Sequence, residues 1–214
     1  TTQWMKGTFR PFHYVQIHHR HLLTGLILLA VVIPAFSRRP SWIVSWPVGL
    51  VGASVILSEI MLMFQLQMST GALYRDAGIL IGLCTAGLCI GSLCAGWTPP
   101  GRSGLIPIQV LIALLFSLSF IILPEPDGHA VLRIYLPGFL FGCLGGIHFG
   151  VAGRTFPQWT PVFYGADLTG AAVASFLVIL FILPVMGFRA VAGIAAALNF
   201  LYSGVLLFRL KPSE

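Results

Sequence analysis

Long apolar stretches, separated by short polar segments, recur along the whole of this 214-residue chain. Most are close to the roughly 20 residues that a helix needs to cross about 30 Å of hydrocarbon while satisfying its own backbone hydrogen bonds. Stretches of this kind occur at residues 21–36, 46–67, 77–96, 105–123, 131–151, 166–186 and 190–208. The pattern predicts an all-α integral membrane protein built as a bundle of about seven transmembrane helices.

The two ends of the chain differ from the apolar stretches. Residues 1–20 mix Trp, Phe and Tyr with Lys and Arg and show no sustained apolar period. Such a composition predicts an interfacial segment, with rings at headgroup depth and cations in the water. The expected organisation is therefore an interfacial segment over residues 1–20, a helical bundle over 21–208 and a cationic tail over 209–214.

Small residues at four-residue spacing mark several of the predicted helices. They allow two helix backbones to approach closely, which is how helices adhere in lipid without a hydrophobic driving force. We expect helix packing through six glycines, namely Gly78, Gly82, Gly87, Gly91, Gly145 and Gly170.

Composition and charge narrow the class of protein. Hydrophobic residues make up 57% of the chain and charged residues only 8%, with a mean hydropathy of +0.93, against about 25% charged residues in soluble domains. The net charge of +6 suits anionic lipid headgroups rather than nucleic acid, because no basic helix or basic–aromatic platform is present. We expect a lipid bilayer as partner, in a bacterial inner membrane. Lys and Arg balance between the two sides, so the orientation stays open.

A few polar residues fall inside the apolar stretches. Glu59 lies near the middle of the second stretch, where a carboxyl costs about 2.5–3.5 kcal/mol to insert. It is interpreted either as a proton- or substrate-binding group or as a structural clamp between helices. Asp167 opens the sixth stretch, where it is expected to cap a helix or to bind substrate. Gln65 and Asn199 complete this set of candidate ligands, and Gln109 is the main strong hydrogen-bonding group of the fourth stretch.

The histidines suggest two further roles. His13, His18 and His19, with Trp4 and Arg10, are predicted to contact lipid headgroups or a partner protein. His21 and His148 could supply one imidazole pair for a b-type haem, although no second pair is visible. No cofactor is evident otherwise, and haem or quinone stays an open alternative beside bound lipid. The four cysteines lack CxxC or Cys/His spacing, so no metal site is expected.

Sequence motifs of soluble enzymes are absent from the chain. There is no GxGxxG following a strand, no P-loop, no HExxH and no GxSxG. The sequence shows no catalytic constellation, so we expect no enzyme activity from this chain by itself.

Two segments carry a family resemblance. Residues 57–96 read as a carboxyl-bearing helix, a Phe–Gln end, a Gly-x-Leu-Tyr loop and a glycine-rich helix. Residues 139–156 and 163–188 form the second segment, which includes the Tyr-x-Ala-Asp-x-x-Gly-Ala pattern at 164–171. Together they resemble the major-facilitator-like membrane portion of spermidine-synthase-like multipass proteins.

The resemblance implies a membrane half that normally accompanies an aminopropyltransferase-type domain. That domain is absent from these residues, so aminopropyl transfer is not assigned to them. His148 stands where the family pattern has glutamine, and Gly150 where it has proline.

Three functions are compatible with these observations. The first is a non-catalytic membrane subunit or domain that anchors and docks a partner, another subunit or a soluble domain, on the N-terminal side. The second is a transporter of small cationic or amphipathic solutes that uses Glu59 and Asp167. The third is a membrane subunit of a respiratory electron-transfer complex that supports haem or quinone.

Overall fold

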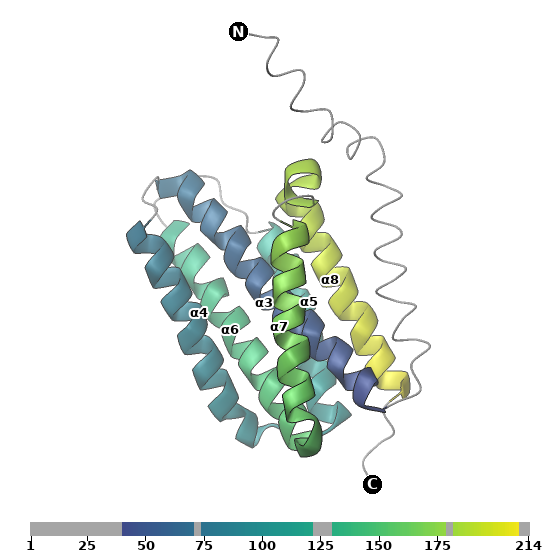
Figure 1. Cartoon of the computed structure of the whole chain (residues 1–214). Coiled ribbons are helices and arrows are strands. Elements are labelled where there is room, and N and C mark those ends of the chain that lie inside the picture. Colours follow the sequence, from purple (N-terminus) through teal and green to yellow (C-terminus); the bar gives the residue numbers. More distant parts are fainter. Residues whose placement is uncertain (1–39, 71–73, 122–129, 179–181, 210–214) are drawn as a thin grey trace.

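The computed structural model describes residues 40–70, 74–121, 130–178 and 182–209. Within these ranges the chain forms α-helices and two short 3₁₀ turns, and no strand. The elements, in order along the bundle of Figure 1, are α3 (Pro40–Thr70), α4 (Tyr74–Cys94), η1 (Ala95–Trp97), α5 (Arg102–Ile121), α6 (Ala130–Thr155), η2 (Pro157–Trp159), α7 (Thr160–Leu177) and α8 (Leu183–Arg209).

Four of the described helices are long and apolar enough to cross a membrane, in agreement with the predicted all-helical membrane protein. Their spans are Ile43–Met68, Tyr74–Trp97, Arg133–Thr155 and Met186–Arg209. The apolar part of α5 is shorter, at Ser103–Ser119. The predicted first span at residues 21–36 and the interfacial segment at 1–20 lie outside the described residues, as does the tail beyond Arg209.

The predicted sixth stretch is wrong in its bounds. It was expected at 166–186, whereas α7 begins at Thr160, with a proline in its first turn, and ends at Leu177. Proline fits the first helical turn, where its missing N–H is not needed. The next helix, α8, starts at Leu183 and changes direction at Gly187, whose φ of 75° lies in the left-handed region that glycine tolerates.

The helices associate mainly in three pairs that are not neighbours in the sequence. The most extensive contacts join α4 to α6, α3 to α7 and α5 to α8. Helices α3 and α6 also pack on each other and connect these pairs into one bundle, with α4 at one edge and α8 at the other (Figure 1).

Glycines bring α4 and α6 together backbone to backbone. A Cβ added at Gly91 would collide with the carbonyl oxygen of Cys143, and one at Gly87 with that of Phe139. From the other side, a Cβ at Gly146 would collide with the carbonyl oxygen of Leu88. We call this contact the α4/α6 seam and define it by five glycines: Gly87, Gly91, Gly142, Gly146 and Gly150.

Among the described residues, four of the six glycines predicted to pack lie close to another helix and two do not. Gly87, Gly91, Gly145 and Gly170 all face another helix closely. An added Cβ at Gly78 or Gly82 would have no atom of another described helix within 4 Å. They precede Gly87 and Gly91 by nine residues, about two and a half helical turns, and therefore lie on the opposite face of α4.

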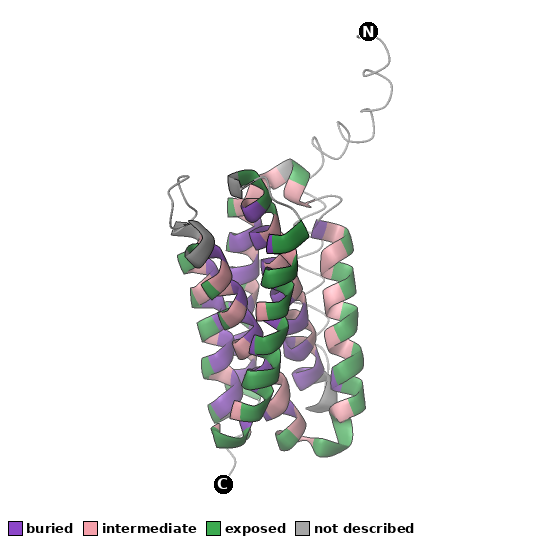
Figure 2. Cartoon of the chain, turned by 90° about the vertical axis from the view of Figure 1, so that its left-hand side faces the viewer, coloured by how far each residue is buried: buried purple, intermediate pink, exposed green. Residues whose placement is uncertain are grey.

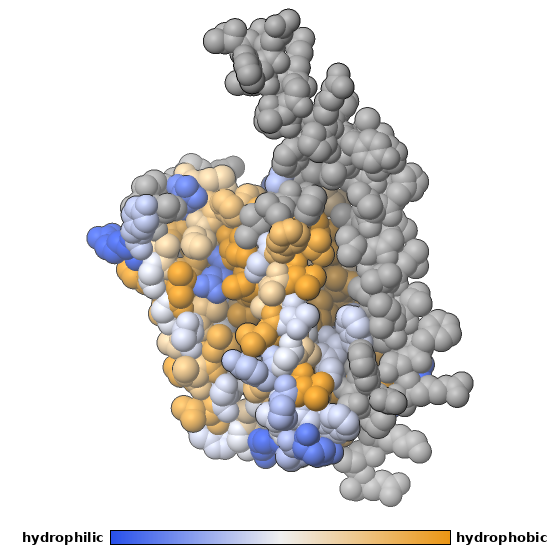
Figure 3. Space-filling view, in the orientation of Figure 1, coloured by the Kyte–Doolittle hydropathy of each residue, from blue (hydrophilic) through white to orange (hydrophobic). Residues whose placement is uncertain are grey.

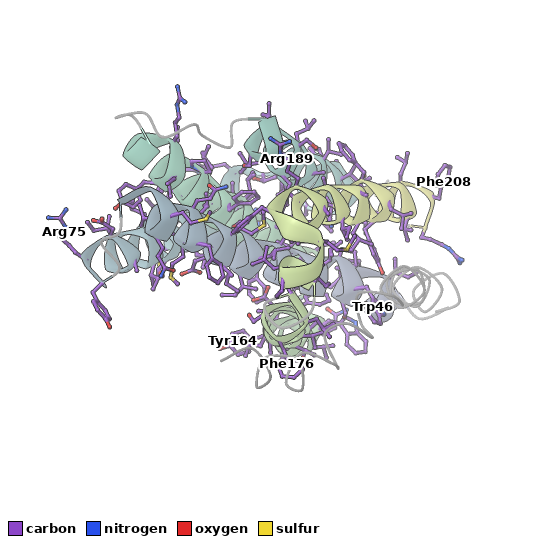
Figure 4. All side chains as sticks on the ribbon, turned by 90° about the horizontal axis from the view of Figure 1, so that it is seen from above. Trp46, Arg75, Tyr164, Phe176, Arg189 and Phe208 are labelled. Carbon is purple, nitrogen blue, oxygen red and sulfur yellow. The ribbon has the colours of Figure 1, made fainter. Side chains whose placement is uncertain are left out.

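The outer faces of the bundle are apolar. Figure 2 shows buried residues on the inward faces of the helices and exposed residues on the outward ones. Large apolar side chains are among the exposed residues, including Phe176, 62% exposed, and Phe208, 86% exposed. With Tyr164, these side chains project outward from the ribbons in Figure 4.

The hydropathy of the surface varies along the length of the bundle. On the face in Figure 3, hydrophobic residues gather over the middle and the most hydrophilic ones over the two ends, with a hydrophilic spot between. A soluble monomer rarely exposes apolar patches of this extent, whereas lipid covers them without cost.

Candidate functional site

Three buried side chains on three helices form a hydrogen-bonded polar layer inside the bundle. Asn199 on α8 accepts a hydrogen bond at Oδ1 from Nε2 of Gln109 on α5, at 3.1 Å. Its Nδ2 donates to Oγ of Ser54 on α3 and to the carbonyl oxygen of Ala195, each at 2.8 Å. Gln109 and Asn199 are completely buried and Ser54 is 2% exposed. Such side chains stabilise helix association in lipid, where the alternative is an unpaired polar group.

Two buried polar groups, one of them on a residue of this layer, have no hydrogen-bond partner among the described residues. One is Oε1 of Gln109, and the other is the imidazole of His148, whose Nδ1 and Nε2 are both unpaired. His148 is completely buried. Helix α6 continues for about two turns beyond His148, to Thr155, so His148 lies in the interior of the helix.

A small cavity lies between four helices, one turn of α3 away from the polar layer. Its volume of about 20 Å³ is enough for one water molecule. Ser58, Gln65 and Ser119 supply polar lining, and the remaining lining residues are Met61, Leu62, Phe116, Phe141 and Ala192. Gln65, predicted as a solute ligand, therefore borders a space of single-water size.

The two candidate carboxyl groups do not meet. Asp167 lies where α7 crosses α3, since a Cβ added at Gly52 would be 2.9 Å from its carboxyl carbon. Glu59 is half-buried on α3, seven residues or about two turns beyond Gly52. Neither carboxyl forms a hydrogen bond or ion pair with a described residue, so the predicted clamp role of Glu59 has no partner in this part of the chain.

The predicted helix-capping role of Asp167 is wrong. Helix α7 begins at Thr160, which makes Asp167 its eighth residue. By that point every backbone N–H has a partner within the helix, so a carboxylate has no free amide to cap. Asp167 is therefore a polar group in the interior of a helix, at a tight helix crossing.

The haem prediction finds only one of its two residues in the described part of the chain. His21 lies outside it, and His148 lies inside the bundle. The described residues contain no group of three His, Cys, Asp or Glu placed to hold a metal ion. The proposed headgroup or partner contacts Trp4, Arg10, His13, His18 and His19 also lie outside the described residues.

Sequence reasoning missed Ser54 of the polar layer and the contact between its other two residues. Ser54 carries no special signal, because serine is tolerated anywhere in a membrane helix when its hydroxyl bonds to the helix itself. Gln109 and Asn199 were each visible as strong hydrogen-bonding groups in apolar stretches, but their mutual contact spans 90 residues of sequence. The available signal for this contact was the presence of one carboxamide side chain in each of two apolar stretches.

Comparison with known proteins adds no assignment: no protein-family model, curated protein or solved structure matches this chain. The resemblance to the membrane portion of spermidine-synthase-like proteins stays a prediction from the quoted motifs.

Proposed function

We propose that this chain is a non-catalytic membrane subunit or domain that anchors and docks a partner protein. The supporting observation is the closed interior of the bundle. The α4/α6 seam joins two helices backbone to backbone, and α3 and α7 meet in the same way at Gly49 and Gly170. Such contacts leave no room for a solute between these helix pairs, which suits a docking platform.

The candidate solute ligands also favour this proposal. Asn199 is engaged by Gln109 and Ser54. Gln65 borders a cavity of single-water size. Glu59 and Asp167 lie about two helical turns apart along α3, too far to bind one small monovalent cation together.

Beyond the four long spans, the proposal also covers the number of crossings, the kind of membrane and the partner. We place α5 and α7 as short crossings and residues 21–36 as the first, which gives seven. The bilayer is a bacterial inner membrane. The partner is a soluble domain or subunit on the N-terminal side, as in a spermidine-synthase-like membrane half whose transferase domain is separate.

Purification from native membranes tests the anchoring function. The tagged full chain, extracted in mild detergent, is expected to yield a complex of one defined mass with a second protein at fixed stoichiometry. Joint replacement of Trp4, Arg10 and His18 by Ala should release that protein, because these residues are the predicted contacts. Native mass spectrometry provides the measurement.

The matched control replaces three residues on the lipid-facing surface, Ile81, Leu93 and Leu111, by Ala, and should leave the complex intact. A monodisperse single chain, stable in mild detergent, would contradict the anchoring function.

Transport of small cations is the second candidate, and Asp167 is the observation that favours it. Its carboxyl lies at a helix crossing without a hydrogen-bond partner among the described residues. A carboxyl in the membrane interior costs several kcal/mol unless it binds a proton, a cation or a polar partner.

Proteoliposome uptake of a labelled small polycation, such as spermidine, distinguishes the two candidates. If the chain is a transporter, Asp167→Asn and Glu59→Gln should each remove most of the uptake. Asp76→Asn serves as the control, because Asp76 is already paired with Arg75 at 3.3 Å at the start of α4. Uptake by the wild type no faster than by empty vesicles would exclude this candidate.

A further inference from the structure

The clearest unexplained feature of the bundle is the imidazole of His148, which is completely buried with both nitrogens unpaired among the described residues. A buried polar group without a partner costs about 1–3 kcal/mol. A folded protein keeps such a group only if something satisfies it.

Helix register places Gln109 opposite His148. The rings of Phe116 on α5 and Phe141 on α6 contact each other, with centroids 4.6 Å apart. Towards the other end of this helix pair, the amide of Gly101 donates to Oγ1 of Thr155, at 2.8 Å. The start of α5 thus lies beside the end of α6, and residues further along α5 lie beside earlier residues of α6. The two helices are therefore antiparallel.

In two antiparallel helices, stepping back along one and forward by the same number of residues along the other, from a pair in contact, leads to two residues at the same height in the bundle. Gln109 precedes Phe116 by seven residues, and His148 follows Phe141 by seven. Seven residues are about two turns and return to nearly the same face of a helix. Gln109 and His148 therefore share a level on the facing sides of α5 and α6, where Oε1 of Gln109 is also unpaired.

The unpaired atoms of Gln109 and His148 can be joined by a molecule that both donates and accepts hydrogen bonds. The Oε1 atom of Gln109 accepts hydrogen bonds, and a neutral imidazole offers one donor and one acceptor. The two side chains do not bond directly. A water molecule, with two donors and two acceptors, can satisfy both groups at once, and buried waters typically make about three such bonds.

We propose that His148 and Gln109 hold one ordered water molecule in the interior of the bundle. This water extends the polar layer from α3, α5 and α8 to α6, through His148, the water, Gln109, Asn199 and Ser54. The binding site takes a small neutral hydrogen-bonding ligand, because the groups that form it are amide, hydroxyl and imidazole.

The small cavity supplies a second place for a water molecule near the polar layer. Its lining residues Ser58 and Gln65 lie on the same face of α3 as Ser54, at offsets of four and eleven residues. Water in this cavity is one helical turn from Ser54 and thus from the polar layer.

Water-edited solid-state NMR of the full chain in liposomes tests this site. With ¹⁵N-labelled histidine, magnetisation from water should reach the ring nitrogens of His148, and the ring N–H should exchange in D₂O. The signal is assigned by its absence in His148→Phe, or from backbone correlations with Ile147 and Phe149 in the wild type if that variant does not fold.

Gln109→Leu should abolish the transfer from water to His148, since it removes the second anchor of the water. Thr85→Leu is the control, because Thr85 is exposed on α4 and bonds only to its own helix, at 2.9 Å. Absence of transfer to His148 in the wild type, while the other histidines receive it, would overturn the proposal. So would transfer that persists unchanged in folded Gln109→Leu.

Discussion

Gly91→Leu is expected to prevent the bundle from folding or to lower its free energy of unfolding by about 3 kcal/mol or more. The reason is the α4/α6 seam, where even a Cβ at this position collides with the backbone of Cys143. Backbone cannot turn aside as a flexible side chain can, so the helices must separate. The measurement is unfolding in mixed detergent–SDS micelles, followed by circular dichroism and by the folded fraction in size-exclusion chromatography.

Gly82→Leu is the matched control, with the same substitution on the same helix. Gly82 faces away from α6, and no other helix in the described part of the chain comes within 4 Å of an added Cβ there. Leucine also has a better helix propensity than glycine, so this variant should be unchanged or more stable by up to about 1 kcal/mol. Equal stability of the two variants would mean that the seam is not a contact of the folded protein.

Asn199→Leu is expected to lower the free energy of unfolding by about 2 kcal/mol, because it leaves Gln109 Nε2 and the Ser54 hydroxyl without their partner. In the double variant Gln109→Leu with Asn199→Leu, the unpaired amide is gone as well. The double variant should therefore be more stable than the sum of the single effects predicts. Interhelical hydrogen bonds in membrane proteins give couplings of about 0.6–1.7 kcal/mol in such cycles.

Ser203→Ala provides the control on the same helix. The Ser203 hydroxyl donates to the carbonyl oxygen of Phe200 in its own helix, at 2.6 Å, so its loss should change stability by no more than about 0.5 kcal/mol. Strict additivity of the Gln109 and Asn199 effects would argue that the polar layer does not hold α5 and α8 together.

The helices were readable from the sequence because the membrane imposes a simple rule on each of them separately. A long apolar run predicts a helix whatever surrounds it. The first and last residues of each helix were harder to predict than its existence, because a helix can begin before an apolar stretch or continue beyond it. At Asp167 the difference of six residues turned an expected cap into an interior residue.

Contacts between helices were predictable only in part. Gly82 and Gly91 carry the same four-residue spacing signal, yet only Gly91 faces a helix. The spacing describes one helix surface, whereas the position of the partner decides which face is used. For the same reason the sequence showed Gln109 and Asn199 as polar residues but not as a pair.

The pairing of the helices has a consequence for how the protein is made. Helices α3, α4 and α5 find their main partners in α7, α6 and α8, which are synthesised later. During insertion the first three described helices must therefore wait in the bilayer with glycine faces and buried amides unmatched. A nascent chain that stops before α8 would leave Gln109 and Ser54 without Asn199. Assembly of the described helices thus waits until α8, the last of them, has been synthesised.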